Sequence, residues 1–203
     1  MSKVYSWRKL NEKELTRVYL DEMRRDFPPT ELKPLSMILN SEADGTAHTW
    51  GVFDGETLAA YLLMVRPAGS RVSQLDYFAV LPEYRAAGLG AQLLADLPQH
   101  ERGAQAILIE AECPDKAEDE TMAVRRLGFY ARCGLRIAGY DTEMFGVHYK
   151  TLYLANGPVD DAALMEEHRF VYENTFSAEK YHKYVRIPFD PKAAPGPKVA
   201  WQQ

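Results

Sequence analysis

The chain has 203 residues, of which 46% are hydrophobic and 26% charged, a mixture that suits one large globular domain or one domain with a small appendage. Its 24 Lys and Arg residues against 29 Asp and Glu residues give a net charge of −5, which disfavours nucleic acids and anionic membrane surfaces as partners. The longest apolar run, residues 58–65, is far shorter than the roughly 20 residues of a membrane-spanning helix. Two cysteines form no disulfide framework, so we expect a soluble, reduced, cytoplasmic protein.

Hydrophobic periodicity predicts a mixed succession of strands and helices along the first 155 residues. Asn11 with Glu14 three residues later forms a capping box that starts the first helix, and Pro28 stops it. In chain order we expect a strand over 5–10, helices over 12–27 and 30–42, and strands over 48–53, 58–65 and 72–81. A helix over 89–97, a strand over 106–112, a helix over 121–133 and one long or two short strands over 136–154 follow.

This order differs from the regular strand–helix alternation of a parallel sheet, so it predicts a mixed α/β (α+β) domain with a mostly antiparallel central sheet flanked by helices. Asn156-Gly157-Pro158 marks a boundary. We expect the core domain over residues 1–157, a helical extension over 158–190 that packs on it and covers a sheet edge, and a disordered, proline-rich tail over 191–203.

The most informative segment follows the strand that ends at Pro82, where Arg85-Ala86-Ala87-Gly88-Leu89-Gly90 leads into a helix. Glycines let backbone N–H groups approach a ligand, and a helix N-terminus offers unpaired donors and a partial positive charge. Together these features predict a phosphate cradle, to which Arg85 can add a charged contact. A Walker loop and a dinucleotide fingerprint both fit less well, because the residues that they require are missing.

The pattern Arg-x-x-Gly-x-Gly, together with Phe129-Tyr130-x-x-x-Gly134-Leu135 at the end of a later helix, resembles the GNAT family of N-acetyltransferases. The resemblance covers residues 3–155 and implies acetyl-CoA as cosubstrate, splayed fourth and fifth strands, and a homodimer as a common assembly. It also implies two sets of cofactor contacts. The pantetheine arm pairs with the strand backbone of Phe78, Ala79 and Val80. The pyrophosphate binds the backbone of the turn, formed by Arg85, Ala86, Ala87, Gly88, Leu89, Gly90 and Ala91.

The implied reaction is direct attack of a primary amine on the thioester in a ternary complex, which needs an acid and a base. Tyr130 matches the family tyrosine that points at the CoA sulfur; periodicity alone would make it a core tyrosine. For the base, Glu110 and Glu112 share one face of a predicted strand, and the alternative for Glu110 is a salt-bridged sheet carboxylate. Asp76 or ordered water remain further alternatives, whereas Gln74 cannot serve.

Other classes of function remain as rivals. His48, His148 and His168 show no ligand spacing, so we expect no metal. A non-catalytic acetyl-CoA sensor on the same fold is the main alternative, and a toxin that acetylates aminoacyl-tRNA is disfavoured by the acidic charge. The acceptor stays open between polyamine, amino acid, aminoglycoside and the amine of a peptide or protein N-terminus.

Overall fold

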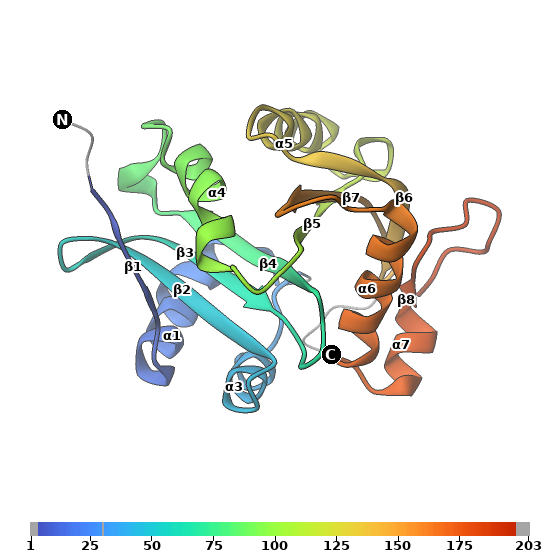
Figure 1. Cartoon of the computed structure of the whole chain (residues 1–203), viewed down its shortest axis with the longest axis horizontal. Helices are drawn as coiled ribbons and strands as arrows, with labels where there is room; N and C mark the ends of the chain where they lie inside the picture. The colour runs from blue at the N-terminus through green and yellow to red at the C-terminus, as the bar shows by residue number, and fades with distance from the viewer. Residues whose placement is uncertain (1–3, 30, 198–203) are drawn as a thin grey trace. The chain divides into compact units, whose positions relative to one another are not determined.

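The computed structural model describes residues 4–29 and 31–197 (Figure 1). These residues form two compact units. The first unit comprises residues 4–29, 31–68 and 75–93, and the second comprises residues 69–74 and 94–197. Helix α4 (Leu89–His100) and strand β4 (Val72–Val80) each contribute to both units.

The first unit contains four strands in the order β1-β2-β3-β4. Besides parts of β4 and α4, its elements in chain order are β1 (Ser6–Lys9), α1 (Glu12–Val18), the π-helical segment η1 (Tyr19–Met23), α2 (Arg24–Asp26), α3 (Leu35–Ala43), β2 (Ala47–Asp54), β3 (Thr57–Val65) and the 3-10 turn η2 (Pro82–Tyr84). Strands β1, β2 and β3 pair antiparallel, and the run from Ala59 to Val65 is buried, as its continuous apolar sequence predicts.

Local chemistry explains where the helices of the first unit begin. Asn11 accepts from the Glu14 N–H while the Glu14 carboxylate accepts from the Asn11 N–H, which confirms the capping box. The second helix, in contrast, was predicted to begin too early. Position 30 lies outside the described residues, and α3 starts only at Leu35, because Pro34 keeps the residue before it out of the helical region.

The second unit contains the start of β4 and four more strands, in the order β4-β5-β7-β6-β8. Its elements are β5 (Ala106–Glu112), the 3-10 turn η3 (Pro114–Lys116), α5 (Glu120–Arg132), β6 (Arg136–Met144), β7 (Val147–Ala155), α6 (Asp161–Glu173), α7 (Ala178–Tyr184) and β8 (Val185–Arg186). The run over 136–154 is two strands, because Phe145 and Gly146 both take positive φ, at 50° and 73°, and turn the chain.

These elements confirm the predicted fold class: mixed α/β, eight mostly antiparallel strands with β4 parallel to β5, and flanking helices. The splay of β4 from β5 stays a prediction. None of the helices in residues 4–29 and 31–197 is both long and apolar enough to cross a membrane.

The segment 158–190 forms α6, α7 and the short edge strand β8, and α6 packs against β6 (Figure 1). The Gly196 N–H donates to Glu143 Oε1 at 2.8 Å, so the described part of the tail contacts the second unit. Residues 198–203 lie outside the described residues. The domain boundaries and the disordered tail therefore stay predictions.

Candidate functional site

The turn between η2 and α4 exposes backbone donors. Ala86 and Gly88 take left-handed φ values of 65° and 77°, and the turn surface is open, since a Cβ on Gly88 would meet nothing within 4 Å. Within the described part of the chain, no acceptor pairs with the N–H groups of Gly88, Leu89 and Gly90. Three unpaired donors at the start of a twelve-residue helix are the donor set that an anion such as a phosphate requires.

Arg85 fixes this turn instead of extending from it. Its Nε donates to the Val80 carbonyl at 2.8 Å, and its terminal nitrogen lies 3.0 Å from Asp26 Oδ1. Asp26 is almost buried, with 7% of its side chain exposed, and also accepts from the Tyr61 hydroxyl at 3.0 Å. The expected direct contact of Arg85 with phosphate would therefore require this ion pair to open.

Phe78, Ala79 and Val80 are half-buried at the end of β4. Their backbone thus lies on the same short segment as the turn that follows. Extended backbone of this kind can pair with an amide-bearing chain by strand addition.

Tyr130 lies near the end of α5, where Gly134, at φ 83°, follows the helix as predicted. Within residues 4–29 and 31–197 its hydroxyl has no hydrogen-bond partner. Burial is the main cause that raises the pKa of Tyr130, while the charge of Arg126 lowers it and Cys133 adds to the rise. The hydroxyl therefore keeps its proton at neutral pH and can donate it.

Glu110 lies in a dense polar network inside the second unit. Its Oε1 accepts from the Thr142 hydroxyl at 2.8 Å, and its Oε2 accepts from Gln74 Nε2 at 2.9 Å and from the Tyr172 hydroxyl at 2.5 Å. His168 Nε2 lies 3.2 Å from Oε1, an ion-pair distance whose angle does not suit a hydrogen bond. These contacts occupy both oxygens of the carboxylate.

The network also sets the acidity of Glu110. Burial by itself would raise the pKa of this carboxyl, but the charge of His168 and the donated hydrogen bonds outweigh burial, so the pKa lies below its ordinary value of 4.5. His168 is fully buried, and its Nδ1 lies 3.2 Å from the Tyr140 hydroxyl. A carboxylate with a depressed pKa is a weak proton acceptor.

The other two candidate carboxylates have different surroundings. Glu112 is half-buried at the end of β5, and its side chain has no partner among the residues described. Asp76 pairs with Lys33 at 2.6 Å, with 13% of its side chain exposed. Of the three carboxylates, Glu112 alone is therefore available without breaking an interaction that the described residues make.

Several residues around these groups were not predicted from the sequence. Asp26 anchors Arg85, and four residues from three elements, β4, β6 and α6, surround Glu110: Gln74, Thr142, His168 and Tyr172. The helical pattern does place His168 and Tyr172 on the buried face of the C-terminal helix. Nothing in the sequence indicates which strand that face meets.

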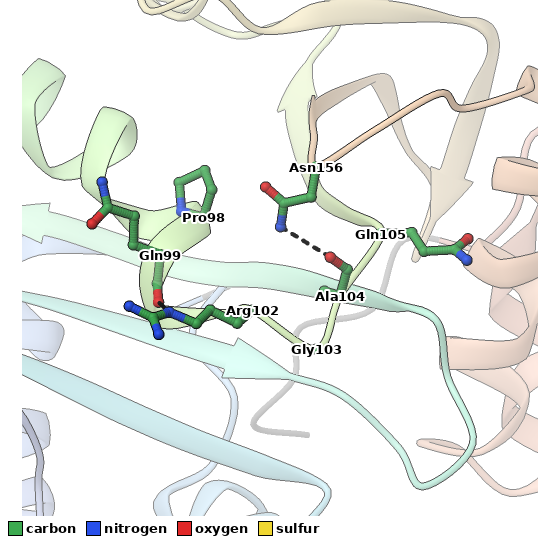
Figure 2. Close-up of a pocket in the computed structure, with 7 residues that line it drawn as sticks. All are labelled: Pro98, Gln99, Arg102, Gly103, Ala104, Gln105 and Asn156. Carbon is green, nitrogen blue, oxygen red and sulfur yellow. Dashed lines mark hydrogen bonds between the residues drawn. The ribbon is translucent and has the colours of Figure 1, made fainter.

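Figure 2 shows a surface hollow where α4 ends and β5 begins. It is lined by Pro98, Gln99, Arg102, Gly103, Ala104, Gln105 and Asn156. Arg102 Nε donates to the Gln99 carbonyl and Asn156 Nδ2 to the Ala104 carbonyl, each at 2.9 Å. No carboxylate, thiol, imidazole or hydroxyl lies in this described lining, so the hollow lacks the groups of acid–base chemistry.

Comparisons with known proteins bear on the turn and on the fold. The profile of the acetyltransferase (GNAT) family matches residues 5–135. No curated protein matches the chain. Among solved structures, a GNAT-family protein from Bacteroides thetaiotaomicron is 21% identical, with 81% of this chain and 95% of that chain covered and a TM-score of 0.64.

Two named enzymes are also similar in structure. Spermidine N-acetyltransferase from Vibrio cholerae, solved with CoA and spermine, is 13% identical over 74% of this chain and 95% of its own, with a TM-score of 0.57. The ribosomal-protein-S18-alanine N-acetyltransferase from Escherichia coli is 17% identical over 77% and 97%, with a TM-score of 0.57. At such identities the likeness shows the fold alone. Because the family profile covers more than half of the chain and includes the Arg85–Gly90 turn, the protein belongs to the acetyltransferase (GNAT) family.

Proposed function

We propose that this protein transfers the acetyl group of acetyl-CoA to a primary amine, by direct attack of the amine on the thioester in a ternary complex. The turn before α4 carries the proposal. Its three unpaired N–H groups, at and directly after the exposed, left-handed Gly88, match the chemistry of a pyrophosphate. Family membership supports acetyl transfer as the reaction class.

The binding roles follow from the backbone. Within the turn Arg85–Ala91, the unpaired amides of Gly88, Leu89 and Gly90 would hold the pyrophosphate, because the N–H groups of Arg85 and Ala91 already donate to the Pro82 and Gly88 carbonyls. The arm of the cosubstrate would pair with Phe78, Ala79 and Val80. Arg85 would act mainly through its contacts with Val80 and Asp26, which fix the turn in place. A turn that is already fixed costs less conformational entropy when a ligand binds.

Tyr130 is the proposed acid. As the amine nitrogen bonds to the thioester carbonyl carbon, the carbon–sulfur bond breaks, and the Tyr130 hydroxyl donates its proton to the departing thiolate. The raised pKa of Tyr130 supports this role, because the acid must enter the reaction protonated. Its hydroxyl makes no hydrogen bond among the described residues that this donation would have to break.

For the base we propose Glu112, with Glu110 as a positioning residue. The carboxylate of Glu112 has no competing partner among the described residues, whereas both oxygens of Glu110 are occupied and its pKa is depressed. The amine proton would pass to Glu112 directly or through one water. Glu110 as the base stays the alternative, and Asp76 would first have to leave Lys33.

The names of the similar enzymes support an amine acceptor. One acts on spermidine and the other on an alanine of a ribosomal protein. A net charge of −5 also favours a cationic acceptor, because the protein attracts positively charged molecules.

The test is a thiol-release assay with acetyl-CoA against a panel of polyamines, amino acids, aminoglycosides and peptide N-termini, alongside calorimetry with CoA. We expect CoA binding and release of free thiol with at least one amine class. Binding without release for any amine would identify a sensor instead. Absence of CoA binding would overturn the proposal altogether.

A further inference from the structure

Three side chains with metal-ligand chemistry lie together in the second unit. Cys113 Sγ, a carboxylate oxygen of Asp141 and a ring nitrogen of His148 all lie within 4.8 Å of one another. Cys113 is buried, and only 13% of the His148 side chain is exposed. None of the three belongs to the groups proposed for acetyl transfer.

The register of β5, β6 and β7 explains why Cys113, Asp141 and His148, which are distant in sequence, lie close together in space. The Cys113 N–H donates to the His148 carbonyl at 2.8 Å, directly after β5 has paired with β7. On the other side of β7, Asp141 of β6 pairs with Lys150. Residues two apart on a strand share one face, so Asp141, His148 and Lys150 lie on the same side of the sheet.

His148 is held in a defined orientation. Its Nε2 lies 2.8 Å from Asp141 Oδ2, and its ring stacks on Phe189 with centroids 4.1 Å apart. An ionised carboxylate only accepts, so Nε2 carries the hydrogen of that contact when the imidazole is neutral. The other nitrogen, Nδ1, is buried and has no hydrogen-bond partner in residues 4–29 and 31–197. A metal ion bound by both Asp141 and His148 would take Nε2 in place of this hydrogen, and the hydrogen would move to the unpaired Nδ1.

Lys150 provides the positive charge in the cluster. Its Nζ lies 2.7 Å from Asp141 Oδ2, the same oxygen that His148 contacts. One third of the Lys150 side chain is exposed, so the ammonium can move into solvent without unfolding a strand. A cation that binds at the cluster would compete with it for Asp141.

We propose that Cys113, Asp141 and His148 bind a divalent transition-metal ion of the Zn²⁺ class. One sulfur, one nitrogen and one oxygen donor suit a borderline-soft ion and not Mg²⁺ or Ca²⁺, which prefer oxygen alone. Ligands at about 2.0–2.3 Å from a tetrahedral zinc lie roughly 3.3–3.8 Å apart, so donors within 4.8 Å need to approach by only about an ångström. The ion replaces the thiol proton, which passes to water, and it links β6 and β7 to the residue that follows β5. Asp115, whose Oδ1 accepts from the Cys113 thiol at 2.9 Å, is a further carboxylate beside the sulfur.

The test is a titration of the chelator-treated full chain with Co²⁺, followed by its absorption spectrum, and with Zn²⁺, followed by its melting temperature. We expect one Co²⁺ per chain with a thiolate-to-metal charge-transfer band, and a rise of roughly 5 °C in melting temperature with Zn²⁺ in large excess over the dissociation constant. Cys113→Ser should abolish the band. Cys133→Ser, the matched control on the other cysteine of the chain, should keep it.

A second variant keeps the test decisive if Cys113→Ser folds poorly. Lys150→Met removes the competing ammonium from the surface side of the cluster, so it should tighten Co²⁺ binding, by roughly fivefold. Asp141→Asn should weaken binding by roughly tenfold or more. A wild-type spectrum without a charge-transfer band, a band that Cys113→Ser retains or Cys133→Ser loses, or a Lys150→Met variant that binds no more tightly would each overturn the proposal. Acetyl transfer is not a readout here, so the two proposals fail independently.

Discussion

At the residue scale, Tyr130 and Glu112 differ from the neighbouring polar side chains because neither the Tyr130 hydroxyl nor the Glu112 carboxylate has a partner among the described residues. Glu110 lies two residues before Glu112 on β5, and both of its carboxylate oxygens accept hydrogen bonds. This contrast is the reason that we propose Tyr130 and Glu112 for proton transfer and Glu110 as a positioning residue.

Replacing Tyr130 by Phe tests the proposed acid. The ring and its packing remain while the proton is lost, so turnover should fall about 100-fold and CoA affinity should stay within about twofold. Steady-state kinetics with thiol detection and calorimetry with CoA measure the two effects separately. Equal losses of turnover and affinity, or no loss of turnover, would contradict the role of Tyr130.

Replacing Glu112 by Gln tests the proposed base. We expect kcat/KM to fall about 100-fold, with the acid limb of its pH profile lost, because the amide cannot accept the amine proton. Glu110→Gln, the matched isosteric change on the same face of β5, should keep that limb even where stability declines. If the two variants exchange these outcomes, Glu110 is the base.

At the element scale, the turn before α4 depends on backbone conformation. Gly88→Val should lower CoA affinity about tenfold or more, because a β-branched residue resists the φ of 77° and rotates the amides of Gly88 and Leu89. Gly55→Val, in the hairpin between β2 and β3 at φ 60°, is the matched control, since neither site offers a steric contact within 4 Å.

Calorimetry with CoA on both variants, with urea unfolding alongside, gives the comparison. The two changes should cost similar stability, about 1–2 kcal/mol each. Only the Gly88 variant should lose affinity. A parallel loss in both variants would mean that the turn has no special role in binding.

Local patterns predicted most elements well, since caps, turns and strand periodicity act within a few residues. Strand β5 has the predicted bounds, Ala106–Glu112, and α5 differs from its prediction by one residue at each end. The prediction failed at α3, where the apolar spacing of Leu32 and Leu35 mimicked one continuous helix across Pro34. The restriction that proline places on the preceding residue overrode the hydrophobic period.

At the scale of the whole molecule, the acid side of the stability curve should depend on Glu110. Its folded pKa lies below 4.5, so its contribution to the free energy of unfolding is present above that pH and is lost as pH falls through the folded pKa. We expect Glu110→Gln to be less stable by about 2 kcal/mol at neutral pH and to lose stability less steeply below about pH 4.5.

Urea unfolding of the wild type, Glu110→Gln and Glu112→Gln between about pH 3 and pH 7 measures this dependence. The Glu112 variant should follow the wild-type slope. An unchanged slope in Glu110→Gln would show that His168 and the surrounding donors do not hold this carboxylate ionised.

How much of the candidate site the sequence could predict depends on how many strands contribute to it. The Arg85–Gly90 turn is one contiguous segment, so its motif can be recognised from the sequence alone. The partners of Glu110 come from β4, β6 and α6, and the cluster of Cys113, Asp141 and His148 comes from β6, β7 and the residue that follows β5. Strand register brings these residues together, and register depends on pairing that one sequence does not reveal.

The proposed function depends above all on the amides before α4, which we expect to bind the pyrophosphate of CoA. The most direct measurement follows the backbone amide resonances of isotope-labelled protein during titration with CoA and, separately, with pantetheine, which lacks the pyrophosphate. We predict that CoA shifts the resonances of Gly88, Leu89 and Gly90 in step with calorimetric binding, while pantetheine leaves them in place. Unshifted resonances at saturating CoA, or equal shifts with pantetheine, would contradict the claim.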